Sequence, residues 1–337
     1  MRLLIGSYFE PDLVERIRKV DPRLQVTYRP ELLGRPRFPG DHTAPVERTA
    51  DQDAEWAALL REAEILFDVY RPQSSNLPER APNLRWIQFS SSGIGGFVES
   101  MGLADSPVVV TNVAGIHAVP LAEFVLFAML YFAKAMPRIL ADQRRHRWER
   151  LAVRNVRGMT LGIVGLGAVG REVARQARQA GIRVVAVRRS AGGAGPDIET
   201  LYPPERLGDL LAASDAVALS VPHTRETVGL IGRTALSSMR KGGVLINISR
   251  GSVVDEPALV EALRSGQLGG AALDVCAVEP LPDESPLWDL PNVLITPHSM
   301  STALGENELI VDLFCDNLHR FLSGRPLRNL FDRGRGY

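Results

Sequence analysis

The sequence predicts an α/β protein with parallel sheets in two domains, and three observations support this. The chain has 337 residues and 45% hydrophobic content, enough for two cores of ordinary size. Short aliphatic runs alternate with helical segments along nearly its whole length, which is typical of doubly wound parallel sheets. Several of these runs end in glycine, serine or a single charged residue, and ligands bind beyond the carboxyl ends of parallel strands.

Residues 1–111 have the pattern of a small α/β domain. We expect strands at 2–6, 25–28, 65–69, 84–89 and 108–112, and helices at 12–20 and 53–63. Residues 34–49 are rich in proline and glycine and predict an irregular loop. The strand at 84–89 runs into Ser-Ser-Ser-Gly, whose small residues and backbone N–H groups suit carboxylate capture. A flexible turn would explain the same residues.

A long helix is expected from about Pro120. The apolar stretch 119–133 is too short to span a bilayer and contains Glu123, so it predicts a buried helix. Residues 138–157 are rich in arginine, diluted by Asp142 and Glu149. A nucleic-acid patch would have this composition, but a helix that faces solvent or a second subunit explains it better.

The stretch 159–190 predicts dinucleotide binding. An apolar run at 160–164 leads into G-x-G-x-x-G, then a helical segment, then a second apolar run at 182–187. This is a βαβ unit with glycines for a tight turn, for approach of a pyrophosphate and for close helix packing, and the helix start attracts phosphate. A purely structural turn is the alternative. The expected cofactor contacts in this turn are Gly165, Gly167, Ala168, Val169 and Gly170.

The end of the second strand of this unit indicates which cofactor binds. NAD-specific sites place Asp or Glu about 20 residues past the fingerprint, where it accepts from the ribose hydroxyl. Here the chain has Arg188, Arg189 and Ser190. Two guanidiniums and a hydroxyl would bind a 2′-phosphate, whereas a carboxylate would repel it. We therefore expect NADP(H), with a pair of solvated arginines as the alternative.

Chemistry-bearing residues follow the later strands, expected at 216–220, 244–248, 270–275 and 293–296. Arg250, Asp274 and His298 lie at or just after such strand ends, and Glu279 follows shortly. A guanidinium can pair with the carboxylate of a 2-oxo acid and polarise its carbonyl. An imidazolium can donate the proton that the new alkoxide needs, and a carboxylate behind it would orient it and stabilise its charge. Each residue alone also has an ordinary structural explanation.

Several motifs in this half of the chain form a specific pattern. They are 247–255 (NISRGSVVD), 272–275 (ALDV), Glu279-Pro280 and 291–298 (PNVLITPH), preceded by 221–227 (VPHTRET). With these motifs the chain resembles the D-isomer-specific 2-hydroxyacid dehydrogenase family, in the family's order, over roughly residues 65 to 300.

The resemblance implies a Rossmann-type dinucleotide-binding domain, residues 112–298, inserted in a flavodoxin-like substrate-binding domain made of 1–111 and the returning segment 299–337. It implies Arg250, Glu279 and His298 as the catalytic set, with Arg250 also binding substrate. Ser92 and Gly93 match the family's substrate-carboxylate loop. Further cofactor contacts implied are Val221, Pro222, Thr227, Ile248, Ser249 and Asp274.

The chain also departs from the family pattern. Arg188 replaces the usual acidic residue, which supports NADPH over NADH. Ala118 stands where many members have threonine, so that a cofactor contact is lost or made by His117. Gly95 replaces a common aspartate, and Ser299-Met300 replaces a small aliphatic pair after the histidine. The last two changes lie by the expected pocket and leave the substrate open among glyoxylate, hydroxypyruvate and a modestly larger 2-oxo acid. Glu279 in place of glutamine argues against the formate dehydrogenase branch.

The composition indicates which partners and which cellular compartment to expect. The formal net charge is zero, which gives no case for nucleic acid or an anionic membrane as partner. The two cysteines lack metal-site spacing, and with no signal-peptide pattern they fit a reducing cytoplasm. We thus expect a cytoplasmic, homodimeric, NADPH-dependent 2-oxo acid reductase without a metal. The alternative is a cofactor-sensing, corepressor-like binding protein with the same fold and little turnover.

Overall fold

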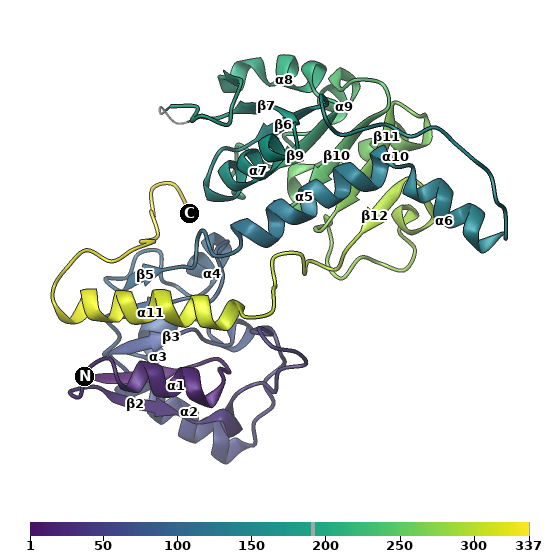
Figure 1. Ribbon diagram of the computed structural model, residues 1–337. Helices are drawn as coiled ribbons and strands as arrows, with labels where there is room; N and C mark the ends of the chain where they lie inside the picture. Colours follow the sequence, from purple (N-terminus) through teal and green to yellow (C-terminus); the bar gives the residue numbers. More distant parts are fainter. Residues whose placement is uncertain (190–192, 337) are drawn as a thin grey trace. The chain divides into compact units, whose positions relative to one another are not determined.

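The chain folds into two compact units, each with its own parallel sheet (Figure 1). The computed structural model describes residues 1–189 and 193–336. One unit comprises Met1–Ile116 together with Thr302–Tyr337, and the other comprises His117–Ser301. The predicted fold class, two parallel-sheet α/β units with one inserted in the other, is confirmed.

The first unit has a five-stranded sheet in the order β2-β1-β3-β4-β5. This is the flavodoxin-like order, in which the strand sequence reverses between β1 and β3. Its strands are β1 (Arg2–Ile5), β2 (Gln25–Tyr28), β3 (Ile65–Phe67), β4 (Trp86–Gln88) and β5 (Val109–Thr111). Its helices are α1 (Pro11–Arg18), η1 (Pro30–Leu32), α2 (Ala50–Glu62), η2 (Arg71–Gln73), α3 (Leu77–Arg80), α4 (Gly95–Ser100) and α11 (Glu306–Leu322). Residues 34–49 are irregular, as predicted.

The C-terminal helix α11 belongs to the core of this first unit. Successive residues of β3 point to opposite faces of the sheet: Leu66 packs with Trp56 of α2, and Phe67 lies on the other face. Phe67 stacks on Phe314 of α11 with 3.9 Å between ring centroids. Phe314 is fully buried, so the returning segment completes one face of the sheet.

The second unit has a seven-stranded sheet in the order β12-β11-β10-β9-β6-β7-β8. The strand order reverses at β6 and β9, and such a reversal is where ligands bind in open α/β sheets. Its strands are β6 (Thr160–Val164), β7 (Arg183–Val187), β8 (Thr200–Tyr202), β9 (Ala216–Leu219), β10 (Gly243–Asn247), β11 (Leu268–Leu273) and β12 (Val293–Ile295). Its helices are α5 (Ala118–Ala133), α6 (Met136–Arg144), α7 (Ala168–Gln179), η3 (Pro204–Arg206), α8 (Leu207–Ala213), α9 (Arg233–Ser238), η4 (Gly251–Val253), α10 (Glu256–Arg264) and η5 (Pro286–Asp289).

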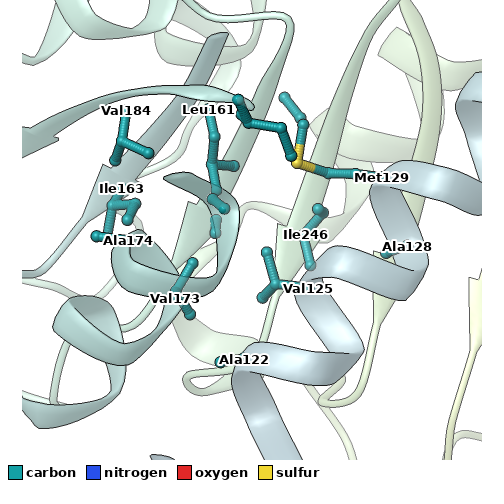
Figure 2. Close-up of a cluster of buried hydrophobic side chains, with 14 of the residues drawn as sticks. Ala122, Val125, Ala128, Met129, Leu161, Ile163, Val173, Ala174, Val184 and Ile246 are labelled. Carbon is teal, nitrogen blue, oxygen red and sulfur yellow. The ribbon is translucent and has the colours of Figure 1, made fainter. Parts of the chain in front are cut away.

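Helix α5 buries one face, as the apolar stretch predicts, while Phe127 and Leu130 are exposed. Its side chains Val125 and Met129 lie in one cluster with Leu161 of β6 and Ile246 of β10 (Figure 2). Further along, the Phe132 ring lies so close to Gly270 of β11 that a Cβ there would come within 2.3 Å of it. Within the described residues no single helix is long and apolar enough to cross a membrane; α5 and α6 together pass by length and composition only, with a 64° bend between them.

The prediction of a helix through the basic stretch 138–157 is wrong for its second half. Helix α6 ends at Arg144, His146 takes a left-handed φ of 54°, and residues 147–155 are irregular. Clustered like charges disfavour a continued helix, and the stretch offers no periodic apolar face to bury. It folds back instead, with Arg138 Nη2 donating to Glu149 Oε2 at 2.8 Å, and Trp148 is 98% exposed.

Candidate active site

The glycine-rich turn after β6 has the geometry of an anion-binding cradle. Gly165 has a φ of +102°, and a Cβ there would lie 2.6 Å from the Ser220 carbonyl oxygen. A Cβ on Gly170 would lie 2.2 Å from the Gly165 carbonyl oxygen. A Cβ on Gly167, in contrast, would meet no described atom within 4 Å beyond its chain neighbours. Two glycines therefore close the turn, and the third faces open space.

This open space lies at the start of α7. Gly167 precedes the helix, and Ala168 and Val169 are its first residues, whose N–H groups cannot bond within the helix. Such N–H groups and the positive end of the helix dipole attract phosphate. The residues present thus fit the pyrophosphate of a dinucleotide, which supplies the nicotinamide when it is bound.

The two arginines expected to give a preference for NADPH over NADH follow the end of β7. The Arg188 N–H donates to the Tyr202 carbonyl of β8 at 3.4 Å, which ties this end of the strand to its neighbour. Arg189 Nη1 lies 3.7 Å from Glu226 Oε2, and both side chains are exposed. Ser190, the third expected contact, lies outside the described residues.

The loop after β9 holds the contacts expected at Val221, Pro222 and Thr227. The Thr227 hydroxyl donates to the Pro222 carbonyl at 2.7 Å and accepts from the Thr224 N–H at 2.8 Å. Thr227 thus closes the loop on itself. Val221 packs against the glycine-rich turn, with its Cγ1 2.9 Å from where a Gly165 Cβ would stand. The loop therefore lies beside the cradle.

Asn247, which the sequence reasoning missed, builds the turn that presents Arg250. Its Oδ1 accepts from the Ser249 N–H at 3.0 Å and the Ser249 hydroxyl at 2.8 Å, and its Nδ2 donates to the Arg250 carbonyl at 3.0 Å. Ile248 and Ser249 are buried by this turn. The available signal was an asparagine at a strand end, two residues before a serine, which is the spacing of an Asx turn.

Arg250 is held in a largely buried position next to the loop that carries Glu279. Burial lowers the pKa of Arg250, and the charge of Glu279 acts in the opposite direction. Its Nη1 donates to the Ser249 carbonyl at 2.7 Å. The following residue, Gly251, is packed so tightly that a Cβ would lie 1.8 Å from the Cys276 carbonyl oxygen. Only glycine lets the two loops approach this closely.

Glu279 and His298 form a direct pair. His298 Nδ1 lies 2.7 Å from Glu279 Oε2, and Glu279 Oε1 accepts from the Cys276 N–H at 3.0 Å. Partial burial acts to raise the pKa of Glu279, but the hydrogen bonds from His298 and Cys276 and the charges of His298 and Arg250 outweigh it and leave the pKa lowered. An ionised carboxylate only accepts hydrogen bonds, so we assign a proton to Nδ1 of His298, which donates to Glu279 Oε2.

Asp274 holds the turn that presents His298. Its side chain is buried, and Oδ1 accepts from the Thr296 hydroxyl at 2.8 Å and from the N–H groups of Ser299 and Met300 at 3.0 and 3.2 Å. Its carbonyl accepts from the His298 N–H at 2.9 Å. His298 itself has a left-handed φ of 51°. The structure therefore gives Asp274 a supporting role that the resemblance did not suggest.

Ser92 and Gly93, the expected carboxylate loop, lie in the first unit after β4. The Ser90 hydroxyl donates to the buried Asp68 carboxylate, and Asn112 Nδ2 donates to the Ser92 carbonyl at 3.4 Å. These bonds fix the turn from both ends. The second unit thus brings Arg250, Glu279 and His298 together by itself, while the Ser92–Gly93 turn is built by the first unit.

Comparisons with known proteins identify the family of this chain. Residues 126–299 match the family model described as D-isomer specific 2-hydroxyacid dehydrogenase, NAD binding domain. The chain is 34% identical over 299 residues to the glyoxylate reductase of Korarchaeum cryptofilum, covering 86% of this chain and 85% of that protein.

Solved structures of the same family match the whole fold. A D-isomer specific 2-hydroxyacid dehydrogenase from Xanthobacter autotrophicus, in complex with NADPH and MES, superposes with a TM-score of 0.81 at 30% identity, covering 100% of this chain and 99% of that one. An NADPH-dependent glyoxylate/hydroxypyruvate reductase from Sinorhizobium meliloti, in complex with NADP and sulfate, gives 0.80 at 26% identity, with coverage of 100% and 99%.

These matches confirm the resemblance and the Rossmann-type cofactor domain, and they do not favour a binding protein without turnover. The family's enzymes are oxidoreductases that act on 2-hydroxy acids with a nicotinamide cofactor. This chain belongs to the D-isomer specific 2-hydroxyacid dehydrogenase family.

Proposed function

We propose that this chain is an NADPH-dependent reductase of small 2-oxo acids, reversible as a D-2-hydroxyacid dehydrogenase. The observation that carries the proposal is the pair of His298 Nδ1 and Glu279 Oε2 at 2.7 Å, beside a largely buried Arg250. These three groups follow neighbouring strands β10, β11 and β12 of one parallel sheet. They supply a carboxylate binder, a proton donor and a group that positions the donor.

Arg250 binds the substrate and activates it. The planar guanidinium pairs with the 2-oxo acid's carboxylate and donates to the carbonyl oxygen, which draws electrons from the carbonyl carbon. Its burial makes this pairing stronger than in water because the local dielectric is low. When the cofactor is bound, its nicotinamide supplies the hydride that this carbon receives.

His298 donates the proton. With Nδ1 held by Glu279, the ring directs Nε2 toward the substrate, and protonated Nε2 delivers its proton to the oxygen as negative charge develops there. Glu279 stabilises the imidazolium and fixes its orientation, and so it is a positioning residue. The His298 side chain is 43% exposed, so solvent can return the proton after each turnover.

The cofactor preference rests on Arg188 and Arg189. Both follow β7, where an acidic residue would accept from a ribose hydroxyl, and their guanidiniums suit a 2′-phosphate instead. The two solved structures described above are complexes with NADPH and with NADP. The remaining contacts assigned to the cofactor are the glycine-rich turn, the 221–227 loop and the buried Ile248-Ser249 pair.

The remaining assignments extend this proposal. The first unit serves as the substrate-binding domain, where the backbone at Ser92 and Gly93 binds the substrate carboxylate. The chain works as a homodimer formed through the second unit, whose helix α5 exposes Phe127 and Leu130 at 50% and 38%. Glyoxylate and hydroxypyruvate are the first substrates to test, because each is a small 2-oxo acid with a carboxylate for Arg250 and a carbonyl oxygen that His298 can protonate.

The test is a panel of 2-oxo acids assayed with NADPH and with NADH, followed by nicotinamide absorbance. We expect turnover of at least one acid, with a higher kcat/KM for NADPH. Failure to reduce any acid with either cofactor would contradict the reductase. Equal or better efficiency with NADH would contradict only the cofactor assignment.

A further inference from the structure

The first unit carries an arginine beside the Ser92–Gly93 turn that the proposed mechanism does not use. Arg71 starts η2, shortly after β3, and its Nη2 donates to the Ser91 hydroxyl at 2.5 Å. Its guanidinium carbon lies 4.4 Å from the ring centroid of Phe97 on α4. Two contacts from separate segments thus fix this guanidinium next to the turn.

The charge of Arg71 is not neutralised by the described part of the chain. Among the described residues its partners are a neutral hydroxyl and an aromatic ring, and none of the described carboxylates forms an ion pair with it. Arg37 of the same unit, in contrast, pairs with Asp41 at 2.7 Å. A guanidinium has five N–H donors, and the Ser91 hydroxyl takes only one. The remaining donors can serve an anion.

We propose that Arg71 binds a second acidic group on the substrate, which makes short 2-oxo diacids the preferred class. The inference rests on the proposed binding of the substrate carboxylate at Ser92 and Gly93. Ser91 directly precedes Ser92 in the chain, so the guanidinium that donates to the Ser91 hydroxyl stands at the same turn as the proposed carboxylate site. A guanidinium at the same turn suits an acid whose second carboxylate, sulfonate or phosphate stands a few bonds from the first.

The test compares two acids of nearly equal size. Oxaloacetate carries a second carboxylate, and 2-oxobutyrate carries a methyl group in its place. We expect the protein to prefer oxaloacetate, and we expect Arg71→Gln to lower kcat/KM for oxaloacetate about 10-fold or more while 2-oxobutyrate changes less than about 3-fold. Retained activity on 2-oxobutyrate also shows that the variant is folded.

Arg85 is a matched control at the other end of β4. It precedes that strand, and its guanidinium lies 5.3 Å from the Phe321 ring centroid. Arg85→Gln therefore removes the same kind of arginine–ring contact away from the turn, and we expect neither acid to be affected. An equal loss for both acids in Arg71→Gln, or no loss for either, would overturn the proposal and leave Arg71 as a support for the turn.

If the protein turns over no 2-oxo acid, the proposed function is contradicted, but the Arg71 subsite can still be tested by binding. Calorimetry in the presence of NADP would then compare D-malate with D-2-hydroxybutyrate. Tighter binding of D-malate that disappears in Arg71→Gln supports the subsite. Equal affinity of the unmodified protein for the two acids refutes it.

Discussion

Replacing Glu279 by glutamine should move the pH profile of the reaction without removing the hydrogen-bonding group. In the structure Glu279 Oε2 lies 2.7 Å from His298 Nδ1, and the side chains are 38% and 43% exposed. Glutamine keeps an oxygen that can accept from Nδ1 but lacks the negative charge that stabilises the imidazolium. The perturbation is therefore electrostatic.

The size of the shift follows from the separation and the exposure. Two unit charges about 4 Å apart interact by about 1 kcal/mol in water and about 4 kcal/mol at an effective dielectric of 20. For half-exposed side chains the interaction energy lies between these limits, because solvent screens the pair. We expect about 1.4–2.8 kcal/mol, which would move the pH profile by about 1–2 pH units.

The pH profile should move to lower pH for reduction and for oxidation alike. Reduction needs protonated His298, and loss of the Glu279 charge makes its proton easier to remove, so the high-pH limb should move to lower pH. Oxidation needs the neutral ring, so its low-pH limb should also move to lower pH. The assay is kcat/KM against pH in both directions. The exposed Glu284, changed to glutamine, is the control. An unshifted profile in Glu279→Gln would refute the pairing of Glu279 with His298.

Three other predictions test separate parts of the structure. Arg188→Asp should shift preference from NADPH toward NADH by about 10–100-fold in kcat/KM, because a phosphate contact is exchanged for a ribose acceptor; unchanged preference would contradict the cofactor assignment. Gly251→Ala should destabilise the fold by about 1–3 kcal/mol and lower kcat/KM, because the added Cβ would lie 1.8 Å from the Cys276 carbonyl oxygen; a wild-type unfolding temperature would count against this close packing. Light scattering at micromolar concentration should give the mass of a dimer, and a monomeric mass would contradict the proposed assembly.

Much of the fold could be predicted because its signals are local. The run 160–170 contains a strand, a tight turn and a helix start within a few residues, and Gly165 does take the positive φ that the turn requires. The apolar stretch from Val119 also predicted the buried helix α5 correctly. In both cases the neighbouring residues alone determine the element.

The parts that could not be predicted depend on contacts between distant segments. Asp274 bonds to Thr296 and to the backbone after His298, twenty-odd residues further on, and only the packing of β11 beside β12 brings them together. The contact of Gly251 with the Cys276 carbonyl likewise joins two loops. In the basic stretch after Arg144 the composition suggested a helix, but the sequence lacks a face to bury, so the helix ends.

The most direct test of the proposed chemistry is the reduction kinetics of His298→Ala with NADPH and the best 2-oxo acid. Loss of the proton donor should lower kcat by about 10²–10⁴-fold. KM should change much less, because Arg250 and not His298 binds the carboxylate. A variant that retains the kcat of the unmodified protein would show that another group delivers the proton, and would contradict the role assigned to the His298–Glu279 pair.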